Sequence, residues 1–455
     1  MYTNKVTPFY IKFFFSLSII SYFCATGWLE VKPDTKLATP TTLKDFQSLL
    51  DNASIMNGSC PGLGEYASDG HYLTDNTFQT ASNILKNAYT WSHEFVYREV
   101  TDWTTPYARI FYCNVILEGL EKSEKKEDGE YDKDNIKGQA LFQRAKALYE
   151  LTEIWAPPYD PHTSKTVLSI PLKLKSDIND VTVRATAYEV LNQIINDLSE
   201  AKGLLPLNQT YVTRASKSAA FALLARIYIS QEDYANAEKY ADSCLRLNSQ
   251  LVDYNSINAE QSYPISPTNN NEILFHSILT TWGTSINFLI DPALYKLYDT
   301  TDLRRDIFFT KNLNGEIRYK GSYDGRYTFF NGLAVDEVYL IMAECSARLG
   351  KVATAIDYLN KLLLKRHNSN FTPLTASTPN QALDLVLTER RKELLCRGLR
   401  WSDLRRLNKD PRLATTIQRA IAQNKYSLEP GSYKYTFPIP DDVFQLSRIE
   451  QNPGW

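Results

Sequence analysis

The stretch Val335–Lys361, with the sequence VDEVYLIMAECSARLGKVATAIDYLNK, decides the fold class of this chain. An earlier stretch, Phe221–Leu247, places small and aromatic residues at matching positions, and equivalent positions in the two stretches lie 118 residues apart. The matched residues have the spacing of a tetratricopeptide unit, which is a pair of helices joined by a short turn. Small residues such as Ala225 and Ala343 are expected at these positions, because they let the partner helix approach closely. Two such units predict a superhelix of stacked helix pairs.

Helical patterns continue on both sides of these units. Apolar residues recur along Gln139–Trp155 at the spacing of one buried helix face. Thr186 followed by Glu189 is a pattern in which two side chains cap each other's free backbone N–H groups, and it predicts a helix start. The stretch Thr378–Gln381 carries the same signal for another helix, which we expect to end before Gly398. The sequence therefore predicts a mainly α-helical chain.

Other segments give shorter or interrupted patterns. The apolar residues of Leu43–Leu50 predict a short helix between loops. The segment Phe78–Leu120 predicts two helices separated by a turn at Trp103–Pro106. The segment Glu121–Lys137 is dense in charges of both signs and is expected to be a solvated loop or helix end. Strand-like patterns are confined to short stretches such as Gly315–Phe330, so β-structure should be minor.

The charge balance excludes several classes of protein. The chain has 455 residues, with 50 Lys and Arg against 52 Asp and Glu. A net charge of -2 without a basic stripe gives no electrostatic basis for binding nucleic-acid phosphates. Apolar residues make up 43% and charged residues 22%, which disfavours both a disordered chain and a multi-span membrane protein. We therefore expect a folded, water-soluble protein that binds no nucleic acid.

The N-terminus has the pattern of an export signal. Basic residues precede the uncharged run Phe13–Phe23, which is too short to span a bilayer. We predict that residues 1–23 are a signal peptide and that Cys24 carries a lipid anchor. The residues Ser21–Phe23 depart from the small residues that usually precede such a cysteine. No later stretch reaches the roughly 18 consecutive apolar residues that a membrane helix needs.

The sequence carries no catalytic or metal-binding signature. The cysteines after Cys24 form no C-x-x-C pair, and we expect them to be buried thiols. The five histidines form no H-E-x-x-H motif, and neither a nucleophile elbow nor a phosphate loop is present. The acidic run Asp128–Asp134 has Lys133 where a calcium loop needs glycine. We expect no catalysis, no cofactor and no metal, although a glycosidase acid pair is defined in space and not by spacing.

Three blocks of sequence carry a family resemblance. Cys24 is followed by Trp28–Pro33, WLEVKP, at the start of the mature chain. Near the C-terminus, Glu389–Arg406 is ERRKELLCRGLRWSDLRR and Phe437–Trp455 is FPIPDDVFQLSRIEQNPGW. With the helix pair of Val335–Lys361, these blocks resemble the SusD/RagB family of outer-membrane nutrient-binding lipoproteins. The shared features are a Trp-x-Asp-Leu-x-Arg core, a Pro-Ile-Pro turn and an Asn-Pro-Gly-aromatic terminus.

The resemblance implies a fold and a function. The fold is a single domain over residues 24–455, with a tetratricopeptide-like scaffold at about 78–250 and 330–455 and an irregular, loop-rich ligand-binding part at about 250–330. The function is that of a non-catalytic protein on the outer membrane, anchored by a lipid on Cys24 and facing the cell exterior. It implies capture of an oligosaccharide for a SusC-like TonB-dependent barrel.

Ligand contacts are expected where the helical pattern is interrupted. Trp282 with Gly283 is the first choice, because an aromatic residue in a loop flanked by Thr, Gly and Ser is poorly explained by packing alone. Tyr72, Trp91 and Trp103 are second choices. Aromatic rings stack on the apolar faces of sugars, while amides, carboxylates and guanidinium groups bind the hydroxyls. Packing within the core is the alternative role for each of these aromatic residues.

Other functions stay open from the sequence. A peptide, as in RagB-like import proteins, is the alternative cargo, and no residue decides between glycan and peptide. A helical-repeat scaffold that binds a protein segment is an alternative of another class. A periplasmic hydrolase would require two acids about 5 to 10 Å apart in a cleft.

The C-terminal block also has a structural interpretation. A second short helix carries Trp401, Leu404 and Arg405. We expect Glu389 or Glu393 to pair with an arginine of this helix beneath the Trp401 ring. Such a buried ion pair specifies the fold and does not catalyse a reaction.

Overall fold

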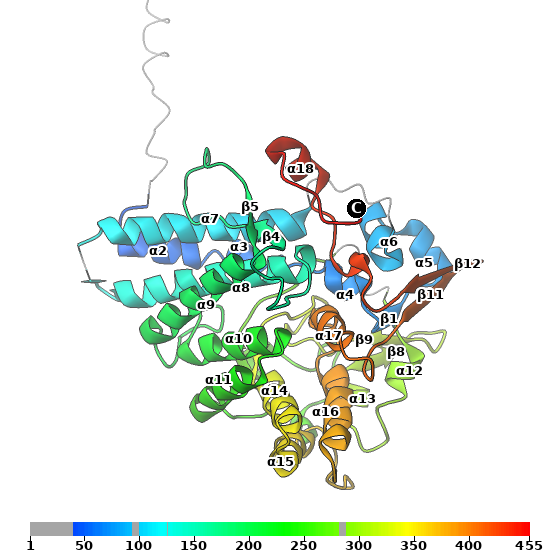
Figure 1. The fold of residues 1–455 in the computed structure, drawn as a ribbon. Coiled ribbons are helices and arrows are strands. Elements are labelled where there is room, and N and C mark those ends of the chain that lie inside the picture. The colour runs from blue at the N-terminus through cyan, green and yellow to red at the C-terminus, as the bar shows by residue number, and fades with distance from the viewer. Residues whose placement is uncertain (1–39, 93–99, 125, 282–287) are drawn as a thin grey trace, which may run out of the picture. The chain divides into compact units, whose positions relative to one another are not determined.

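The computed structural model describes residues 40–92, 100–124, 126–281 and 288–455. The chain divides into two units, Met1–Thr41 and Thr42–Trp455, and the helices and strands given below belong to the second. That unit is mainly helical, as the repeat pattern predicts (Figure 1). The predicted signal peptide and Cys24 lie outside the described residues. Among the helices that are described, none has the length and apolar character needed to cross a bilayer.

Both predicted tetratricopeptide units are present as helix pairs. Each pair has a tight turn, in which Glu232 and Gly350 have left-handed backbone conformations with φ angles of 63° and 78°. Ala225 and Ala343 are fully buried, so neighbouring helices can approach closely. Helix α11 of the first pair packs directly against α14 of the second. The pairs are α10 (Lys217–Ser230) with α11 (Tyr234–Leu247), and α14 (Val335–Arg348) with α15 (Val352–Leu363).

These units extend one continuous stack of helices. Helix α7 packs on α8, α8 on α9, and α9 on α10, while α16 packs on α14. Figure 1 shows this succession from the cyan helices α7 and α8 to the orange helix α16. Helix α8 contacts helices on both sides, and residues around most of its circumference are buried. The long helices outside the two units are α7 (Thr101–Lys122), α8 (Lys133–Trp155), α9 (Ala187–Leu204) and α16 (Pro379–Glu393).

The predicted reciprocal caps begin two of these helices. The Thr186 hydroxyl accepts the Glu189 N–H at 3.2 Å, and the Glu189 carboxylate accepts the Thr186 N–H at 2.8 Å, at the start of α9. Thr378 and Gln381 cap α16 in the same manner. Each cap satisfies backbone N–H groups that the first helical turn leaves free. The helix starts read from these two patterns are therefore confirmed.

The predicted turn at Trp103–Pro106 is wrong. Helix α7 begins at Thr101 and runs through Pro106, which lies in its second turn. A proline there removes a single N–H from the hydrogen-bond ladder, and a helix tolerates this loss best near its start. The preceding helix ends earlier, at Trp91, whose φ of 51° is left-handed. The position of Pro106 therefore does not mark the break between α6 and α7.

The remaining elements are short. Within the described residues, β-structure consists of six antiparallel pairs of short strands. The strands are β1 (His71–Tyr72) with β7 (Leu289–Ile290), β2 (Glu127–Asp128) with β3 (Tyr131–Asp132), β4 (Leu168–Pro171) with β5 (Arg184–Thr186), β6 (Ile273–Phe275) with β10 (Leu333–Ala334), β8 (Phe309–Lys311) with β9 (Ile317–Tyr319), and β11 (Ile417–Ile421) with β12 (Asn424–Leu428). The short helices are α2 (Leu43–Leu50), α3 (Ala53–Met56), α4 (Leu63–Ala67), α5 (Asp75–Thr80), α6 (Asn83–Thr90), α12 (Pro292–Tyr295), α13 (Arg304–Ile307), α17 (Arg400–Leu407) and α18 (Asp441–Ser447). Single 3₁₀ turns lie at Tyr254–Ser256, Pro267–Asn269 and Tyr433–Tyr435.

Two further expectations are met. Helix α2 is the short helix predicted from the apolar residues near the N-terminus. The five cysteines in the described part of the chain are buried and free, as expected for thiols that pack in the core.

Buried ion pairs join the irregular segment between α11 and α14 to helix α16. Arg304 is fully buried and donates to Glu389 at 2.6 Å and to Glu393 at 2.8 Å. Arg366 is also fully buried and donates to the other oxygen of Glu393 at 2.6 Å and to Glu272 at 2.8 Å. Each guanidinium that folding removes from water is thus surrounded by carboxylates.

The partners predicted for Glu389 and Glu393 are wrong, since these residues bind Arg304 and not an arginine of α17. On α17, Arg406 pairs with Glu344 of α14 at 2.5 and 2.7 Å. Arg405 donates to backbone carbonyls at the end of α8. The interpretation as structural ion pairs holds, but the partners come from a segment too distant in sequence to be identified from local spacing.

Replacement of Ala355 with Leu in α15 is expected to destabilise the protein by about 1–3 kcal/mol, because Ala355 is fully buried and added methyl groups overpack the contact. Ala353 in the same helix is exposed, so Ala353→Leu is the matched control. The control should change the free energy of unfolding by less than about 0.5 kcal/mol. Urea unfolding followed by circular dichroism measures both variants. Equal stability of the two variants would contradict close helix packing at Ala355.

Glu393→Gln is expected to lower the free energy of unfolding by about 3–5 kcal/mol, because it leaves two buried guanidinium groups with an uncharged partner. The control is Asp357→Asn, which removes an exposed ion pair with Lys361 and should cost less than about 1 kcal/mol. Chemical unfolding measures the difference. A cost for Glu393→Gln no larger than that of the control would show that the buried network contributes little to stability.

Candidate functional site

The candidate site surrounds the short helix α4, whose first turn is fixed by a buried carboxylate. Asp102 accepts the backbone N–H groups of Gly62 and Leu63 at 2.6 and 2.8 Å. Asp102 has no exposed surface. The free N–H groups and the positive dipole end of a helix start favour such an acidic partner. Helix α7, which carries Asp102, therefore determines where α4 lies.

At the other end of α4, Arg419 of strand β11 holds three chain segments together. Its guanidinium donates to the carbonyl oxygens of Tyr66, at 3.2 Å, and of Ser68 and Tyr89. The same group lies over two aromatic rings, 3.7 Å from the centroid of Tyr89 and 4.7 Å from that of Trp91. The ends of α4 and α6 are thereby fixed beside β11.

A cavity of 250 Å³ lies where these elements meet strand β1. Successive residues of a strand point to opposite faces, so His71 is buried while Tyr72 is half-buried. The lining residues are Asp69, His71, Tyr72, Leu73, Tyr89, Asp291, Arg391 and Thr415–Ala420. We refer to this cavity, with β1, β11 and the end of α4 around it, as the α4 site.

The acidic groups of the α4 site have structural partners. Asp69 lies 2.6 Å from Arg400 and 3.2 Å from Arg391. Burial alone would raise the pKa of Asp69, but the Arg400 guanidinium outweighs burial, so the pKa lies well below its ordinary value. Asp291 accepts the Leu294 N–H at 2.9 Å and caps α12. The acidic groups of the site are therefore already engaged with partners inside the protein.

His71, at the α4 site, has a ring nitrogen without a hydrogen-bond partner among the described residues. It is 6% exposed, and its Nε2 has no hydrogen-bond partner within the described part of the chain. Burial, and then the charge of Arg419, lower the pKa of His71 from 6.5 to about 3, so the ring is neutral near neutral pH. A neutral imidazole nitrogen can donate to or accept from a ligand hydroxyl.

Tyr72 is the second-choice residue that the structure places at this cavity. Trp91 and Trp103 are buried, with 2% and 4% of their surface exposed, and neither lines the cavity. Trp91 Nε1 donates to the Ala67 carbonyl at 3.1 Å, and Trp103 packs edge-on against Trp155 at 5.1 Å. Both tryptophans therefore pack in the core. Of the three second-choice residues, Tyr72 alone lines this cavity.

Trp282 and Gly283, the first-choice residues, lie outside the described residues. The next described residue, Phe288, packs against His71 with the ring centroids 4.4 Å apart. Phe288 therefore lies next to a residue that lines the α4 site. Ligand contact at Trp282 and Gly283 stays a prediction.

Sequence reasoning missed Asp69, His71, Arg391 and Arg419. The Arg400 to Asp69 contact joins residues 331 positions apart, and no local spacing signals such a pair. Along β11 residues alternate between buried and exposed, with Arg419 on the buried face and Ala420 on the exposed face. The residue types alone would have predicted the opposite for these two positions, because arginine is rarely buried without specific acceptors.

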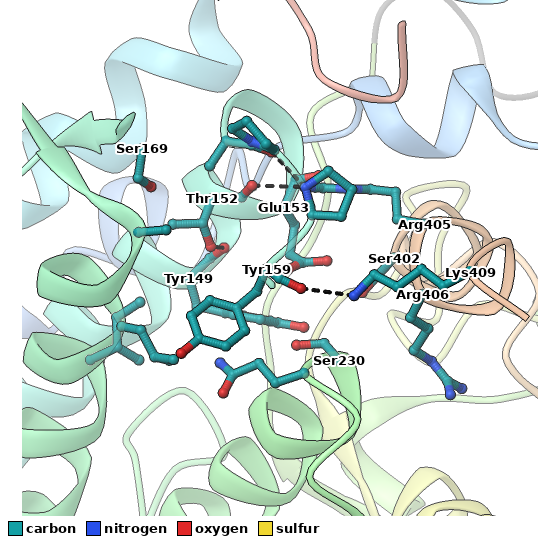
Figure 2. Close-up of a pocket in the computed structure, with 17 residues that line it drawn as sticks. Tyr149, Thr152, Glu153, Tyr159, Ser169, Ser230, Ser402, Arg405, Arg406 and Lys409 are labelled. Carbon is teal, nitrogen blue, oxygen red and sulfur yellow. Dashed lines mark hydrogen bonds between the residues drawn. The ribbon is translucent and has the colours of Figure 1, made fainter. Parts of the chain in front are cut away.

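A second cavity, of 40 Å³, lies between α8, α9 and α17 (Figure 2). Its basic groups already have partners. Arg405 donates to the carbonyl oxygens of Thr152 and Ala156 at 3.2 and 2.5 Å, and Lys409 donates to that of Tyr159 at 2.8 Å. Arg405 thereby bonds carbonyl groups that the last turn of α8 leaves free, at the negative end of the helix dipole. A space of this size holds a few water molecules at most, so we assign it a structural role.

The fold is that of a helical-repeat protein, and the α4 site is its candidate binding site. Residues 27–229 match a family model for SusD-like proteins, described as starch-binding and associating with the outer membrane. Residues 335–455 match the model of the SusD family. The chain belongs to the SusD/RagB family, as the sequence resemblance predicts.

Curated relatives carry the same family name. "SusD-like protein P2" of Formosa agariphila is 22% identical, and the alignment covers 96% of this chain and 94% of that protein. "SusD-like protein P38" of the same organism is 22% identical over 423 residues, covering 76% of this chain and 79% of the relative.

Solved structures share the fold. A crystal structure described as a putative sugar-binding protein from Bacteroides vulgatus has a TM-score of 0.74 and 23% identity, covering 92% of this chain and 99% of that chain. A SusD superfamily protein from Bacteroides thetaiotaomicron has a TM-score of 0.73 and 20% identity, covering 90% and 100%. These likenesses establish the helical-repeat fold for the present chain.

Glu65 of α4 gives the site a testable pH dependence. Its carboxylate accepts the Gly398 N–H at 2.9 Å, and burial raises its pKa from 4.5 to about 7. Because the folded pKa is the higher one, the stability contributed by the protonated form is complete below pH 4.5 and lost as pH rises to about 7. Glu65→Gln should therefore become more stable relative to the wild type over this range, by an amount on the order of 3 kcal/mol.

Urea unfolding of both proteins at about pH 5 and about pH 8 measures this effect. Glu121→Gln, at an exposed position near the end of α7, is the control and should leave the pH dependence unchanged. A difference between Glu65→Gln and the wild type that stays constant with pH would contradict a raised pKa for Glu65.

Proposed function

We propose that this protein is a non-catalytic cell-surface protein that captures an oligosaccharide at the α4 site for a SusC-like TonB-dependent outer-membrane transporter. One observation carries the proposal of a ligand here. His71, which is buried and neutral and has an unpartnered Nε2, and the half-buried Tyr72 both line a cavity of 250 Å³. The family description of starch binding and association with the outer membrane supports this type of ligand and location.

The chemistry of the α4 site suits an uncharged ligand with many hydroxyl groups. Tyr72 offers an aromatic ring for the apolar face of a sugar, while the exposed side chain of Gln418 adds a polar group nearby. A strongly charged ligand would gain less, because Asp69 and Arg391 already form an ion pair. These features favour a neutral glycan over a charged cargo.

The partners of the acidic groups argue against hydrolysis at this cavity. A glycosidase needs one carboxylic acid that keeps its proton near neutral pH. Asp69 has a lowered pKa because of Arg400, and Asp291 is engaged as a helix cap. Glu65, whose pKa is raised to about 7, does not line the cavity. Binding without catalysis is therefore the activity we assign to the site.

Membrane attachment and delivery complete the proposal. A lipid on Cys24 would hold the protein on the outer face of the outer membrane, where it can capture ligands too large to diffuse through the membrane. Apart from Arg391 of α16, the residues that line the α4 site lie outside the long helices of the stack, so the stack offers a separate surface for the barrel protein. Co-purification of a TonB-dependent barrel with this protein from native membranes would support this step. Co-purification of a different partner, with no barrel present, would contradict it and favour a role as an interaction scaffold.

Tyr72→Ala is expected to weaken binding of a neutral oligosaccharide by about tenfold, which corresponds to about 1.4 kcal/mol, because the stacking face is removed. The probes are neutral oligosaccharides prepared from starch, xylan and β-mannan, measured by isothermal titration calorimetry. Tyr327→Ala is the matched control, because its ring is 55% exposed and does not line the cavity. Trp282→Ala tests the first-choice residue in the same titration.

Two results would overturn the proposal. Wild-type protein that binds a mixture of oligopeptides but no oligosaccharide would identify a peptide cargo. Oligosaccharide binding that is unchanged in Tyr72→Ala and in Trp282→Ala would place the ligand elsewhere on the molecule.

A further inference from the structure

A larger groove, of 690 Å³, lies away from the α4 site. It is formed by the connection between α9 and α10, the end of α11 and the segment around the 3₁₀ turn Pro267–Asn269. Its volume is within the range of roughly 300–1,000 Å³ found for small-molecule sites. The lining residues are Leu207, Asn208, Gln209, Tyr211, Val212, Arg214, Ser216, Ser218, Leu247–Gln250, Pro267, Thr268, Asn270, Asn271, Ile273 and Leu274.

The groove is polar but carries little charge. Among the described residues that line it, Arg214 is the one charged side chain, and it forms a two-point ion pair with Asp51 at 2.8 and 2.7 Å. The Arg214 guanidinium also lies 5.3 Å from the centroid of the Tyr211 ring. Amides and hydroxyls make up most of the other polar lining groups. Such a lining recognises a neutral ligand with many hydroxyl groups better than an ionised one.

Asn270 provides an independent indication of a ligand. Its side chain is 94% buried, since only 6% of its surface is exposed, and it lines the groove. The side-chain oxygen accepts the Glu272 N–H at 2.9 Å. The side-chain nitrogen has no hydrogen-bond partner among the described residues. A buried donor without an acceptor costs about 1–3 kcal/mol, and an oxygen of a ligand hydroxyl would remove this cost.

An exposed aromatic ring borders the same groove. Tyr211 is 59% exposed, although it is held in place by the guanidinium of Arg214. Asn208, Gln250 and Asn271 are exposed polar residues around the groove. An aromatic platform beside amide groups is an arrangement that binds sugars, because the ring meets C–H groups and the amides meet hydroxyls.

We propose that this groove is a second glycan-binding site, separate from the α4 site and specific for neutral oligosaccharides. The inference rests on the proposed function for the class of ligand but uses none of the residues of the α4 site. Two sites on one protein would bind a long polysaccharide more tightly than either site alone, because the second contact forms at a high effective concentration.

Tyr211→Ala and Asn270→Ser test the groove. Tyr211→Ala removes an exposed ring and should not affect folding, while Asn270→Ser replaces the buried amide N–H₂ with a shorter hydroxyl that can still accept the Glu272 N–H. The control is Tyr263→Ala, which removes an exposed tyrosine outside the groove. Isothermal titration with the same starch, xylan and β-mannan oligosaccharides gives the stoichiometry and affinity of each variant.

We expect the wild type to bind two oligosaccharides, and both groove variants to lose about tenfold in affinity at one of them. Tyr72→Ala should leave the groove site intact, and the Tyr72→Ala, Tyr211→Ala double variant should lose affinity at both sites. Titrations of Tyr211→Ala and Asn270→Ser that match the wild type overturn the groove proposal while leaving the α4 site standing. Binding lost in the groove variants but unchanged in Tyr72→Ala supports the groove and overturns the α4 site. A wild type that binds none of these oligosaccharides overturns both.

Discussion

A guanidinium that folding removes from water must be surrounded by acceptors, and in this protein the acceptors come from distant parts of the chain. Arg304 lies in the irregular segment between the two helix pairs, while its partners Glu389 and Glu393 lie on α16. Arg366 shares Glu393 and adds Glu272, which precedes strand β6. An alternative arrangement of the irregular segment would leave several buried charges without partners, at a cost of several kcal/mol each. The ion pairs therefore specify one arrangement of a segment that has few regular elements of its own.

The same principle positions the α4 site. Asp102 fixes the start of α4 through two backbone N–H groups, and Arg419 fixes its end through backbone carbonyls. A short helix with so few internal hydrogen bonds is not stable alone. Charged side chains from α7 and β11 thus supply hydrogen bonds that a longer helix would form within its own backbone. They fix α4 beside the cavity that Tyr72 and His71 line.

The helical scaffold was predictable from the sequence because its signals are local. The repeat at Phe221–Leu247 and Val335–Lys361, and the caps at Thr186 and Thr378, depend on residues a few positions apart. The site was predictable only in part. Tyr72 lines the cavity, whereas the tryptophans chosen from their loop-like surroundings, Trp91 and Trp103, pack in the core. An aromatic residue looks the same in the sequence in either role, because its burial depends on contacts between separate segments, such as Trp91 with Ala67 and Trp103 with Trp155.

Strand β11 has a consequence for the order in which the protein matures. Arg419, which closes the end of α4, is synthesised more than three hundred residues after the helix that it completes. A chain synthesised only as far as α6 lacks this guanidinium, so the carbonyls of Tyr66, Ser68 and Tyr89 have not yet met the donor that they bond in the folded protein. A chain cut short before β11 would retain much of its helical repeat and yet lack a finished pocket. The wall that β11 gives the cavity is therefore added late in synthesis, after all of the long helices given above.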